Sequence, residues 1–254
     1  MTHWYEEAFG RDYLALYPHR DLAEARADVA AIVGLIAPPK DGPLLDLCCG
    51  AGRHLEALHE EGFTDLTGID LSEQLLDVAR RRLDARGATE VRLLRSDMRR
   101  IPYRGQFETI LSLFTSFGYF SETGEDAAVL RAAYDALRPG GTFLMDTLNR
   151  PWTVEHLSPR SERSIDGADV LITRRISPDG LRVEKEIRVE PNGEPAKRYR
   201  ESVRMYTADE LRALLQAAGF ANVRFHGALD GRPCDADSPR TVAVGHRPHS
   251  TEDG

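Results

Sequence analysis

"LLDLCCGAGRH", running from Leu44 to His54, joins an apolar run to a glycine-containing turn and then to a helix-forming segment. A short apolar run that ends at glycines is typical of a buried strand. Gly50 and Gly52 permit a tight turn, and the residues from Arg53 to Glu61 have the spacing of an amphipathic helix. The stretch therefore predicts a strand–turn–helix unit, the building block of an α/β fold.

The same alternation continues through the first 150 residues. Further strands are predicted at 65–70, 91–96, within 107–117 and at 141–148, with helices at 22–36, from Ser72 to near Gly87 and from Asp126 to Leu137. Repeated strand–helix–strand units with short links indicate a parallel sheet covered by helices on both faces. The pattern resumes late in the chain with a capped helix at 207–220 and two closing strands.

Between these two parts the pattern changes to period two. Residues 161–206 hold three polar, alternating stretches separated by the turn sequences "SPDG" and "PNGEP". In the middle stretch, the apolar residues from Leu181 to Val189 share one face. The other face carries Arg182, Glu184, Glu186, Arg188 and Glu190. This alternation predicts an antiparallel meander with one solvated face.

The predicted organisation has three parts. Residues 1–39 form an N-terminal helical cap, and residues 40–150 and 207–247 form the α/β core. Residues 151–206 form an inserted antiparallel β region that serves as a substrate lid or an interface.

Composition restricts the classes of partner. The chain carries a formal net charge of −8, which argues against the basic face that a nucleic-acid partner requires. Its three cysteines do not make a disulfide framework and fit a reducing cytoplasm. No apolar run reaches membrane-spanning length, and the N-terminus lacks the apolar region of a signal peptide. We expect a cytoplasmic protein with a small-molecule substrate and no nucleic-acid or membrane partner, acting as a monomer or a homodimer.

Acidic residues lie at the ends of the first three predicted strands, where open parallel sheets bind ligands. Asp70 ends the second strand 18 positions after Gly52, about the 20-residue spacing at which an acid meets a pair of ribose hydroxyls. Asp97 follows the third strand, and Asp46 lies just before the turn. Both a dinucleotide and S-adenosylmethionine (SAM) fit a ribose-binding acid. The dinucleotide pattern G-x-G-x-x-G fails at Leu55, and the three acids favour a cationic nucleoside over an anionic diphosphate.

Five stretches, in order, resemble the class I SAM-dependent methyltransferases of the small-molecule type. They are "LLDLCCGAGRH", "LTGIDLSEQLLDVAR", "RSDMRRIP", "FETILSLFTSFGYF" and "LRPGGTFLMDTLNR". The family pattern at the turn is D-x-G-x-G-x-G, and here Cys48 replaces the first glycine. The resemblance implies an α/β fold with a seven-stranded, mostly parallel sheet whose last strand is antiparallel. It also implies SAM as cofactor and methyl transfer to a small-molecule acceptor, at nitrogen or oxygen. "LFTSFGYF" is similar to the corresponding stretch of N-methyltransferases of amino sugars.

The resemblance implies cofactor contacts by matching position. They are Asp46, Cys48, Gly50, Ala51, Gly52, Asp70, Leu71, Asp97, Met98 and Leu113. Residues 50–52 would pass under the SAM amino acid, and Asp70 would hold the ribose hydroxyls. Residues 71, 97 and 98 would contact adenine, Leu113 would lie beside the methionine portion, and Asp46 would support the ammonium group.

Two adjacent cysteines in the turn raise the alternatives of a thiol site or a metal site. A zinc site needs four ligands at workable spacing, and Cys48 and Cys49 do not offer them. They are interpreted as small residues in a tight turn, His54 as a capping or packing residue, and no metal is expected.

Candidate acceptor residues come from two regions. The N-terminal stretch "YLALYPHRD" (13–21) belongs to a segment that often folds over the active site in this family. The alternative is a surface helix with a proline break. The second region follows the fourth and fifth strands, where the fold puts substrate contacts. The predicted catalytic residues are His19 and Tyr119, and the predicted substrate-binding residues are Tyr13, Tyr17, Arg20, Phe117, Asn149 and Arg150.

Sulfonium is already a good leaving group, so methyl transfer needs mainly positioning and desolvation. A general base is required only if the acceptor must lose a proton. Two other classes remain open: an enzyme that uses SAM for non-methyl chemistry such as cyclisation, and a non-catalytic SAM-binding module. A nicotinamide oxidoreductase fits the turn less well.

Overall fold

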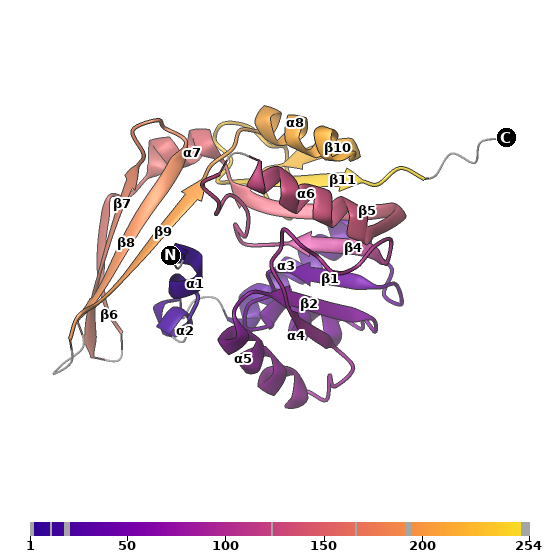
Figure 1. Ribbon diagram of the computed structural model, residues 1–254, viewed down its shortest axis with the longest axis horizontal. Coiled ribbons are helices and arrows are strands. Elements are labelled where there is room, and N and C mark those ends of the chain that lie inside the picture. The colour runs from indigo at the N-terminus through magenta and orange to yellow at the C-terminus, as the bar shows by residue number, and fades with distance from the viewer. Residues whose placement is uncertain are drawn as a thin grey trace.

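The computed structural model describes residues 3–10, 12–17, 21–122, 124–165, 167–190 and 195–249. It contains two sheets, a seven-stranded sheet flanked by helices and a separate four-stranded sheet at one end of the molecule (Figure 1). None of the helices in these described ranges is long and apolar enough to cross a lipid bilayer.

The large sheet has the strand order β10-β11-β5-β4-β1-β2-β3. Its strands are β1 (Leu44–Leu47), β2 (Leu66–Asp70), β3 (Arg92–Arg95), β4 (Phe107–Ser112), β5 (Leu137–Leu148), β10 (Ala221–His226) and β11 (Arg240–His246). Strand β11 is antiparallel to both of its neighbours, and β1 to β5 pair in parallel. All four residues of β1 are buried, as a central strand covered on both faces requires. The predicted seven-stranded sheet with an antiparallel last strand is therefore confirmed.

Helices cover both faces of this sheet (Figure 1). One face carries α3 (Leu22–Ile36), α4 (Arg53–Glu60) and α5 (Glu73–Asp84), and the other carries α6 (Glu125–Ala136) and α8 (Ala208–Ala218). Helix α3, which the sequence grouped with the N-terminal cap, thus belongs to a layer of the core. Side-chain caps begin α3 at Asp21 and α5 at Ser72, and a capping box begins α8 at Thr207.

The small sheet is an antiparallel meander in the order β6-β7-β8-β9. Its strands are β6 (Arg160–Ile165), β7 (Ala168–Ile176), β8 (Arg182–Glu190) and β9 (Lys197–Arg204), and α7 (Arg150–His156) precedes it. Three of these strands correspond to the predicted stretches. Strand β6 was not predicted because its sequence, RSERSI, offers only one apolar residue to an alternation pattern.

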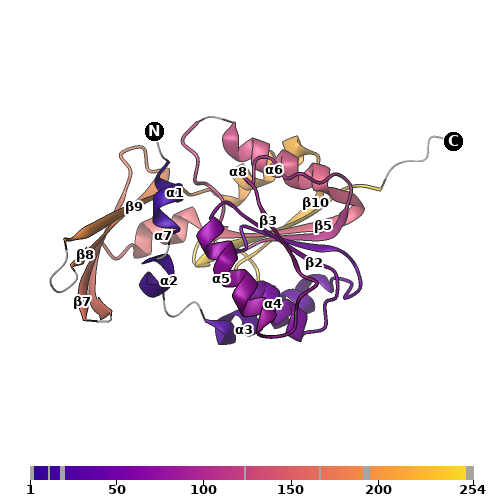
Figure 2. The same ribbon diagram turned by 60° about the horizontal axis from the view of Figure 1, so that its bottom comes forward.

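Two short N-terminal helices, α1 (Trp4–Ala8) and α2 (Asp12–Leu16), lie between the small sheet and α5 (Figures 1 and 2). Leu16 packs against Val170, Ile172 and Ile187, three buried apolar residues of the small sheet. The N-terminal segment is thereby placed next to the carboxyl ends of the large sheet's strands.

Candidate active site

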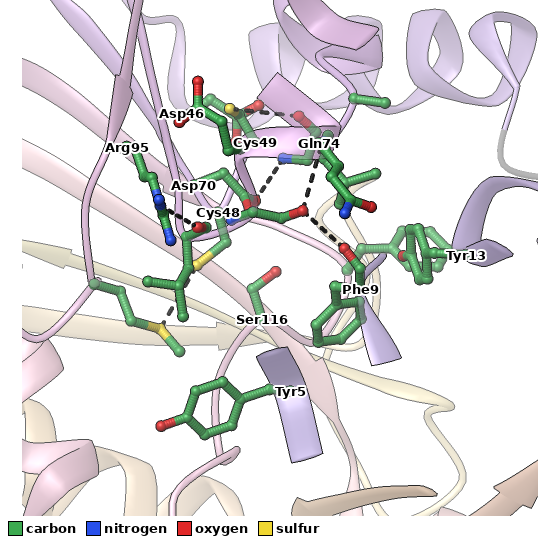
Figure 3. A pocket seen from close by; sticks show the side chains of 18 of the residues that line it. Tyr5, Phe9, Tyr13, Asp46, Cys48, Cys49, Asp70, Gln74, Arg95 and Ser116 are labelled. Carbon is green, nitrogen blue, oxygen red and sulfur yellow. Dashed lines mark hydrogen bonds between the residues drawn. The ribbon is translucent and has the colours of Figure 1, made fainter. Parts of the chain in front are cut away.

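A cavity of about 570 Å³ opens at the carboxyl ends of β1, β2 and β4 (Figure 3). Strand order reverses between β1 and β4, and open α/β sheets bind ligands at such a switch point. One side of the cavity consists of the segments that follow the strands, including residues 48–51, 70–75 and 95–98. The other side consists of residues from α1 and α2 together with Tyr119 and Phe120.

The structure brings nearly all predicted cofactor residues to this cavity. Its walls include Asp46, Cys48, Gly50, Ala51, Asp70, Leu71, Asp97, Met98 and Leu113. Gly52 does not line the cavity. It begins α4 with φ 75°, and a Cβ atom there would lie 2.9 Å from the Cβ of Ala79 on α5. Its place in the turn therefore allows α4 and α5 to pack closely.

Asp70 connects the turn after β1 with the loop after β2. Its Oδ2 accepts a hydrogen bond from the Gly50 amide, and its Oδ1 accepts one from the Ser72 amide, each at 2.8 Å. Burial raises the pKa of Asp70, while the two amides favour the ionised form. Each carboxylate oxygen has two lone pairs, so both retain capacity to accept a hydroxyl from a ligand.

Asp46 and Arg53 line the cavity, and each has a buried polar atom without a hydrogen-bond partner in the part of the chain that the structure describes. Within the described residues, neither Asp46 Oδ2 nor Arg53 Nη2 has a hydrogen-bond partner, although both are buried. Asp46 is only 1% exposed, and burial raises its pKa to about 6, with His54 and Arg53 partly opposing the shift. Buried charged groups are normally paired. A carboxylate and a guanidinium that each keep one atom without a hydrogen-bond partner in the described structure fit the ammonium and carboxylate groups of an α-amino acid.

Arg53 was not among the predicted site residues. It is the first residue of α4, and its Nη1 donates to Glu24 Oε2 at 2.5 Å while its guanidinium lies 4.7 Å from the centre of the Phe114 ring. The signal was present in the sequence, because a basic residue directly after G-x-G stands at the electropositive start of a helix.

Cys48 adopts a left-handed backbone conformation with φ 66°, where the related pattern has glycine. Its side chain lines the cavity, and its Sγ lies 3.6 Å from Met98 Sδ. Burial, with the nearby Asp70, raises the pKa of both the Cys48 and the Cys49 thiol well above the ordinary value. Protonated thiols are poor nucleophiles and poor metal ligands, which agrees with a packing role. Among the described residues no group of three or more His, Cys, Asp or Glu side chains is placed to hold a metal ion.

Aromatic side chains form the end of the cavity nearest the N-terminal segment. Tyr119 packs against Trp4 and Phe9, with ring centres 5.2 and 5.5 Å apart, and Tyr5 packs against Phe120 at 5.5 Å. Trp4 Nε1 donates to the Tyr119 carbonyl at 3.2 Å. We call Trp4, Tyr5, Phe9, Tyr119 and Phe120 the aromatic cluster.

Ser72 connects the aromatic cluster to the strand ends. Its hydroxyl donates to the Phe9 carbonyl at 2.8 Å and accepts from the Leu75 amide at the start of α5. The residue that caps α5 therefore also holds the N-terminal segment over the cavity.

Two predicted acceptor residues, Tyr13 and Tyr119, line the cavity. Tyr17 instead contacts the small sheet, where its hydroxyl donates to Glu201 at 2.6 Å. His19 and Arg20 lie outside the described residues. Tyr5, which was not predicted, also lines the cavity, and its buried hydroxyl has no hydrogen-bond partner in the described part of the chain. The aromatic N-terminal stretch "WYEEAF" was the available signal.

Three other predicted substrate contacts lie away from the cavity walls. Phe117 is 2% exposed and belongs to the apolar core. The Asn149 amide donates to the carbonyls of Asp235 and Ser238 at 2.8 and 2.7 Å, and Arg150 pairs with Glu210 at 2.9 Å. The polar groups of Asn149 and Arg150 are thus engaged in contacts within the fold, and substrate contact at these three positions stays a prediction.

The chain is similar to a known protein family and to individual known proteins. Residues 44–141 match a family model described as a methyltransferase domain. The chain is 35% identical over 133 residues to dTDP-3-amino-3,4,6-trideoxy-alpha-D-glucopyranose N,N-dimethyltransferase from Streptomyces venezuelae, and this alignment covers 52% of each protein. The chain thus spans about half the length of that relative.

Two longer matches extend the comparison over most of the chain. The chain is 29% identical over 232 residues to dTDP-3-amino-3,6-dideoxy-alpha-D-glucopyranose N,N-dimethyltransferase from Streptomyces fradiae, covering 88% of this chain and 83% of the relative. It is also similar to the SAM-bound structure of an amino pentose methyltransferase from Micromonospora echinaspora, with a TM-score of 0.68 and 27% identity. That match covers 93% of this chain and 97% of the other.

The backbone at Cys48 leads to a stability prediction. Because a Cβ atom is strained at positive φ, Cys48→Gly should be more stable than Cys48→Ala by about 1 kcal/mol in chemical denaturation. Both variants lack the thiol, so their difference isolates the backbone. The matched control is Cys49, which does not have a positive φ and where alanine should be at least as stable as glycine. The same order of stability at both positions would contradict the assignment of strain to Cys48.

Proposed function

We propose that this chain is a class I SAM-dependent methyltransferase and that it transfers a methyl group from SAM to a nitrogen or oxygen atom of a small molecule. The observation that carries the proposal is that two cavity-lining residues, Asp46 and Arg53, each keep a buried polar atom without a hydrogen-bond partner among the described residues, and that Asp70 lines the same cavity. A carboxylate, a guanidinium and a ribose-binding acid together suit a nucleoside that carries an amino acid.

The residues at the cavity fit SAM group by group. Arg53 would bind its carboxylate, Asp46 its ammonium and Asp70 its ribose hydroxyls. Leu71, Asp97 and Met98 would contact adenine, in keeping with their place on the cavity wall. When bound, SAM supplies a methyl group activated by its sulfonium.

The remaining residues would position the acceptor and exclude water. The aromatic cluster closes the end of the cavity opposite the polar groups and lowers the local polarity. Its rings would orient the acceptor so that a lone pair faces the methyl group, which is the main requirement of this reaction. Within it, Tyr119 is our candidate for the polar contact to the acceptor, and His19 stays a sequence-based prediction. This built acceptor end favours an enzyme over a non-catalytic binding module.

An amine is the acceptor that the cavity supports best. Aromatic faces attract cationic groups, and a methylated amine becomes cationic as the bond forms. The names of the two relatives from Streptomyces describe N,N-dimethyltransferases of dTDP-linked amino sugars. A hydroxyl acceptor is the second candidate.

We further infer action in the cytoplasm, as a monomer or homodimer. Three free cysteines (48, 49 and 234) are consistent with a reducing compartment. The net charge of −8 supports a small-molecule substrate over nucleic acid.

The function is tested with labelled SAM and a panel of dTDP-linked amino sugars beside their hydroxyl analogues. We expect label in an amine product together with one equivalent of S-adenosylhomocysteine.

Asp70→Asn should weaken SAM binding about 10- to 100-fold, because it loses charge-assisted hydrogen bonds. Asp77→Asn on the exposed face of α5, where Asp77 pairs with Arg80, is the matched control.

In the labelling assay, label only in hydroxyl products would select the second candidate acceptor, and a product formed from SAM alone would indicate cyclisation. Tight NADH binding without SAM binding would overturn the proposal.

SAM affinity should depend on pH through Asp46. Its pKa of about 6 leaves the carboxyl largely protonated at pH 5 and ionised at pH 7. The ionised form attracts ammonium, so we expect affinity to rise from pH 5 to 7 and binding near pH 5.5 to release a proton. The stability of the ligand-free protein should change with pH in the opposite direction. Because the pKa of Asp46 is raised in the folded state, its carboxyl contributes stability at low pH, and this contribution is lost as pH rises through 6.

Calorimetry in buffers of different ionisation enthalpy measures the released proton. The control is Asp46→Asn, which keeps the shape of the side chain and leaves His54, Arg53 and Asp70 in place. A variant with the same pH profile as the wild type would show that the titrating group is not Asp46.

A further inference from the structure

Arg182, the first residue of β8, extends from the small sheet to the loop that follows β4. Its Nη1 donates to the Phe120 carbonyl at 2.9 Å, and its Nη2 donates to the carbonyls of Gly118 and Tyr119 at 3.1 and 3.3 Å. Nη2 also donates to the Ser202 carbonyl at 2.7 Å, and Nε donates to the Ser202 hydroxyl at 2.8 Å. One side chain thus holds three consecutive carbonyls of the loop and a residue of β9.

Each of these acceptors is a neutral oxygen, although Arg182 carries a full charge. Burial lowers the pKa of Arg182, and the charge of Asp126 partly opposes that shift. A charged guanidinium that leaves water and binds neutral carbonyl oxygens gains little net stability, because it gives up strong hydration. The planar fork of a guanidinium does, however, hold several acceptors in one fixed arrangement, whereas the three donors of an ammonium rotate freely.

The loop is also pressed directly against the end of the small sheet. Gly118 has φ 91°, and a Cβ atom there would lie 2.4 Å from the Arg204 carbonyl oxygen. The Arg204 amide donates to the Gly118 carbonyl at 2.7 Å, and the Met205 amide donates to the Leu181 carbonyl at 2.8 Å. The close approach leaves the loop little freedom to move away from β9.

The side chains of this loop form the acceptor end of the cavity. Tyr119 and Phe120 line it, and a second cavity of about 100 Å³ lies behind them, with walls that include Trp4, Arg182 and Ser202. The polar groups for SAM come from other elements: Asp46 from β1, Arg53 from α4 and Asp70 from β2. A substitution at Arg182 should therefore affect the acceptor end of the cavity more than the cofactor end.

We propose that Arg182 is a positioning residue through which the small sheet sets the place of Tyr119 and Phe120, and so the binding of the acceptor. The inserted sheet is then a support for the acceptor site. This inference rests on the proposed function, because it takes the aromatic end to be where the acceptor binds.

Arg182→Lys keeps the charge and removes the fork, and Arg182→Met removes both. The matched control is Arg175→Met on the neighbouring strand β7, where Arg175 is 76% exposed and pairs with Glu184. With the acceptor identified by the labelled-SAM assay, both Arg182 variants should lower kcat/KM about 10-fold or more, mainly through KM for the acceptor. SAM affinity should stay within about 2-fold of the wild type, and the control should match the wild type in both.

Fluorescence tests the positioning without any acceptor. The chain has two tryptophans, so Trp152→Phe leaves Trp4, whose indole bonds to the Tyr119 carbonyl, as the sole emitter. In this background the Arg182 variants should shift Trp4 emission to longer wavelength and increase its quenching by acrylamide, while Arg175→Met should not. A wild-type chain that methylates no acceptor would count against the proposed function, and the fluorescence would still test the positioning.

Three results would overturn the inference. The first is unchanged Trp4 emission together with unchanged kcat/KM in both variants. The second is a loss of SAM affinity as large as the loss of acceptor binding. The third is an equal emission shift in Arg175→Met. If Arg182→Met does not fold, Arg182→Lys alone decides among these outcomes, because it retains the charge and most of the side-chain volume.

Discussion

The Asp70 carboxylate holds together the segments that make the site. One oxygen accepts the Gly50 amide from the turn after β1, and the other accepts the Ser72 amide from the loop after β2. The Ser72 hydroxyl then donates to the Phe9 carbonyl in the N-terminal segment. Three parts of the chain that are distant in sequence thus meet around one half-buried carboxylate at the end of β2. A continuous series of hydrogen bonds joins Gly50, Asp70, Ser72 and the Phe9 carbonyl.

The two ends of the cavity differ in physical character. At the strand ends, Asp46 and Arg53 each keep a buried polar atom that has no hydrogen-bond partner among the residues described. This burial lowers the stability of the free protein, and a ligand with the opposite charges would restore the missing interactions. At the other end, the aromatic cluster offers ring faces, and the Arg99 guanidinium lies 4.2 Å from the centre of the Phe120 ring. The proposed cofactor, with its zwitterionic amino acid group, and the proposed amine acceptor would therefore have separate surroundings within one cavity. The small sheet lies behind the acceptor end, so the inserted region and the core contribute to the same site.

Regular periodicity made the core predictable from sequence. The helix after Ser72 was recognised by its cap and by apolar residues at helical spacing, and it begins and ends close to the predicted positions. Contacts between distant residues were not predictable in this way. Asn149 follows a strand end as a substrate contact would, yet its amide binds carbonyls 86 and 89 positions away. Arg182 alternates with apolar residues as a solvated residue would, yet it lies where β8 meets the loop of residues 118–120. Helices α1 and α2 are too short to show a pattern and depend on packing against other elements.

Recognition of an amino acid group by Asp46 and Arg53 is the central claim of this account. Calorimetric titration with S-adenosylhomocysteine and with 5′-methylthioadenosine tests it most directly, because the second ligand keeps the adenosine and lacks the ammonium and the carboxylate. Each charge-assisted hydrogen bond is worth roughly 1.5–3 kcal/mol, so S-adenosylhomocysteine should bind at least about 10-fold more tightly. Equal affinity for the two ligands would contradict the account.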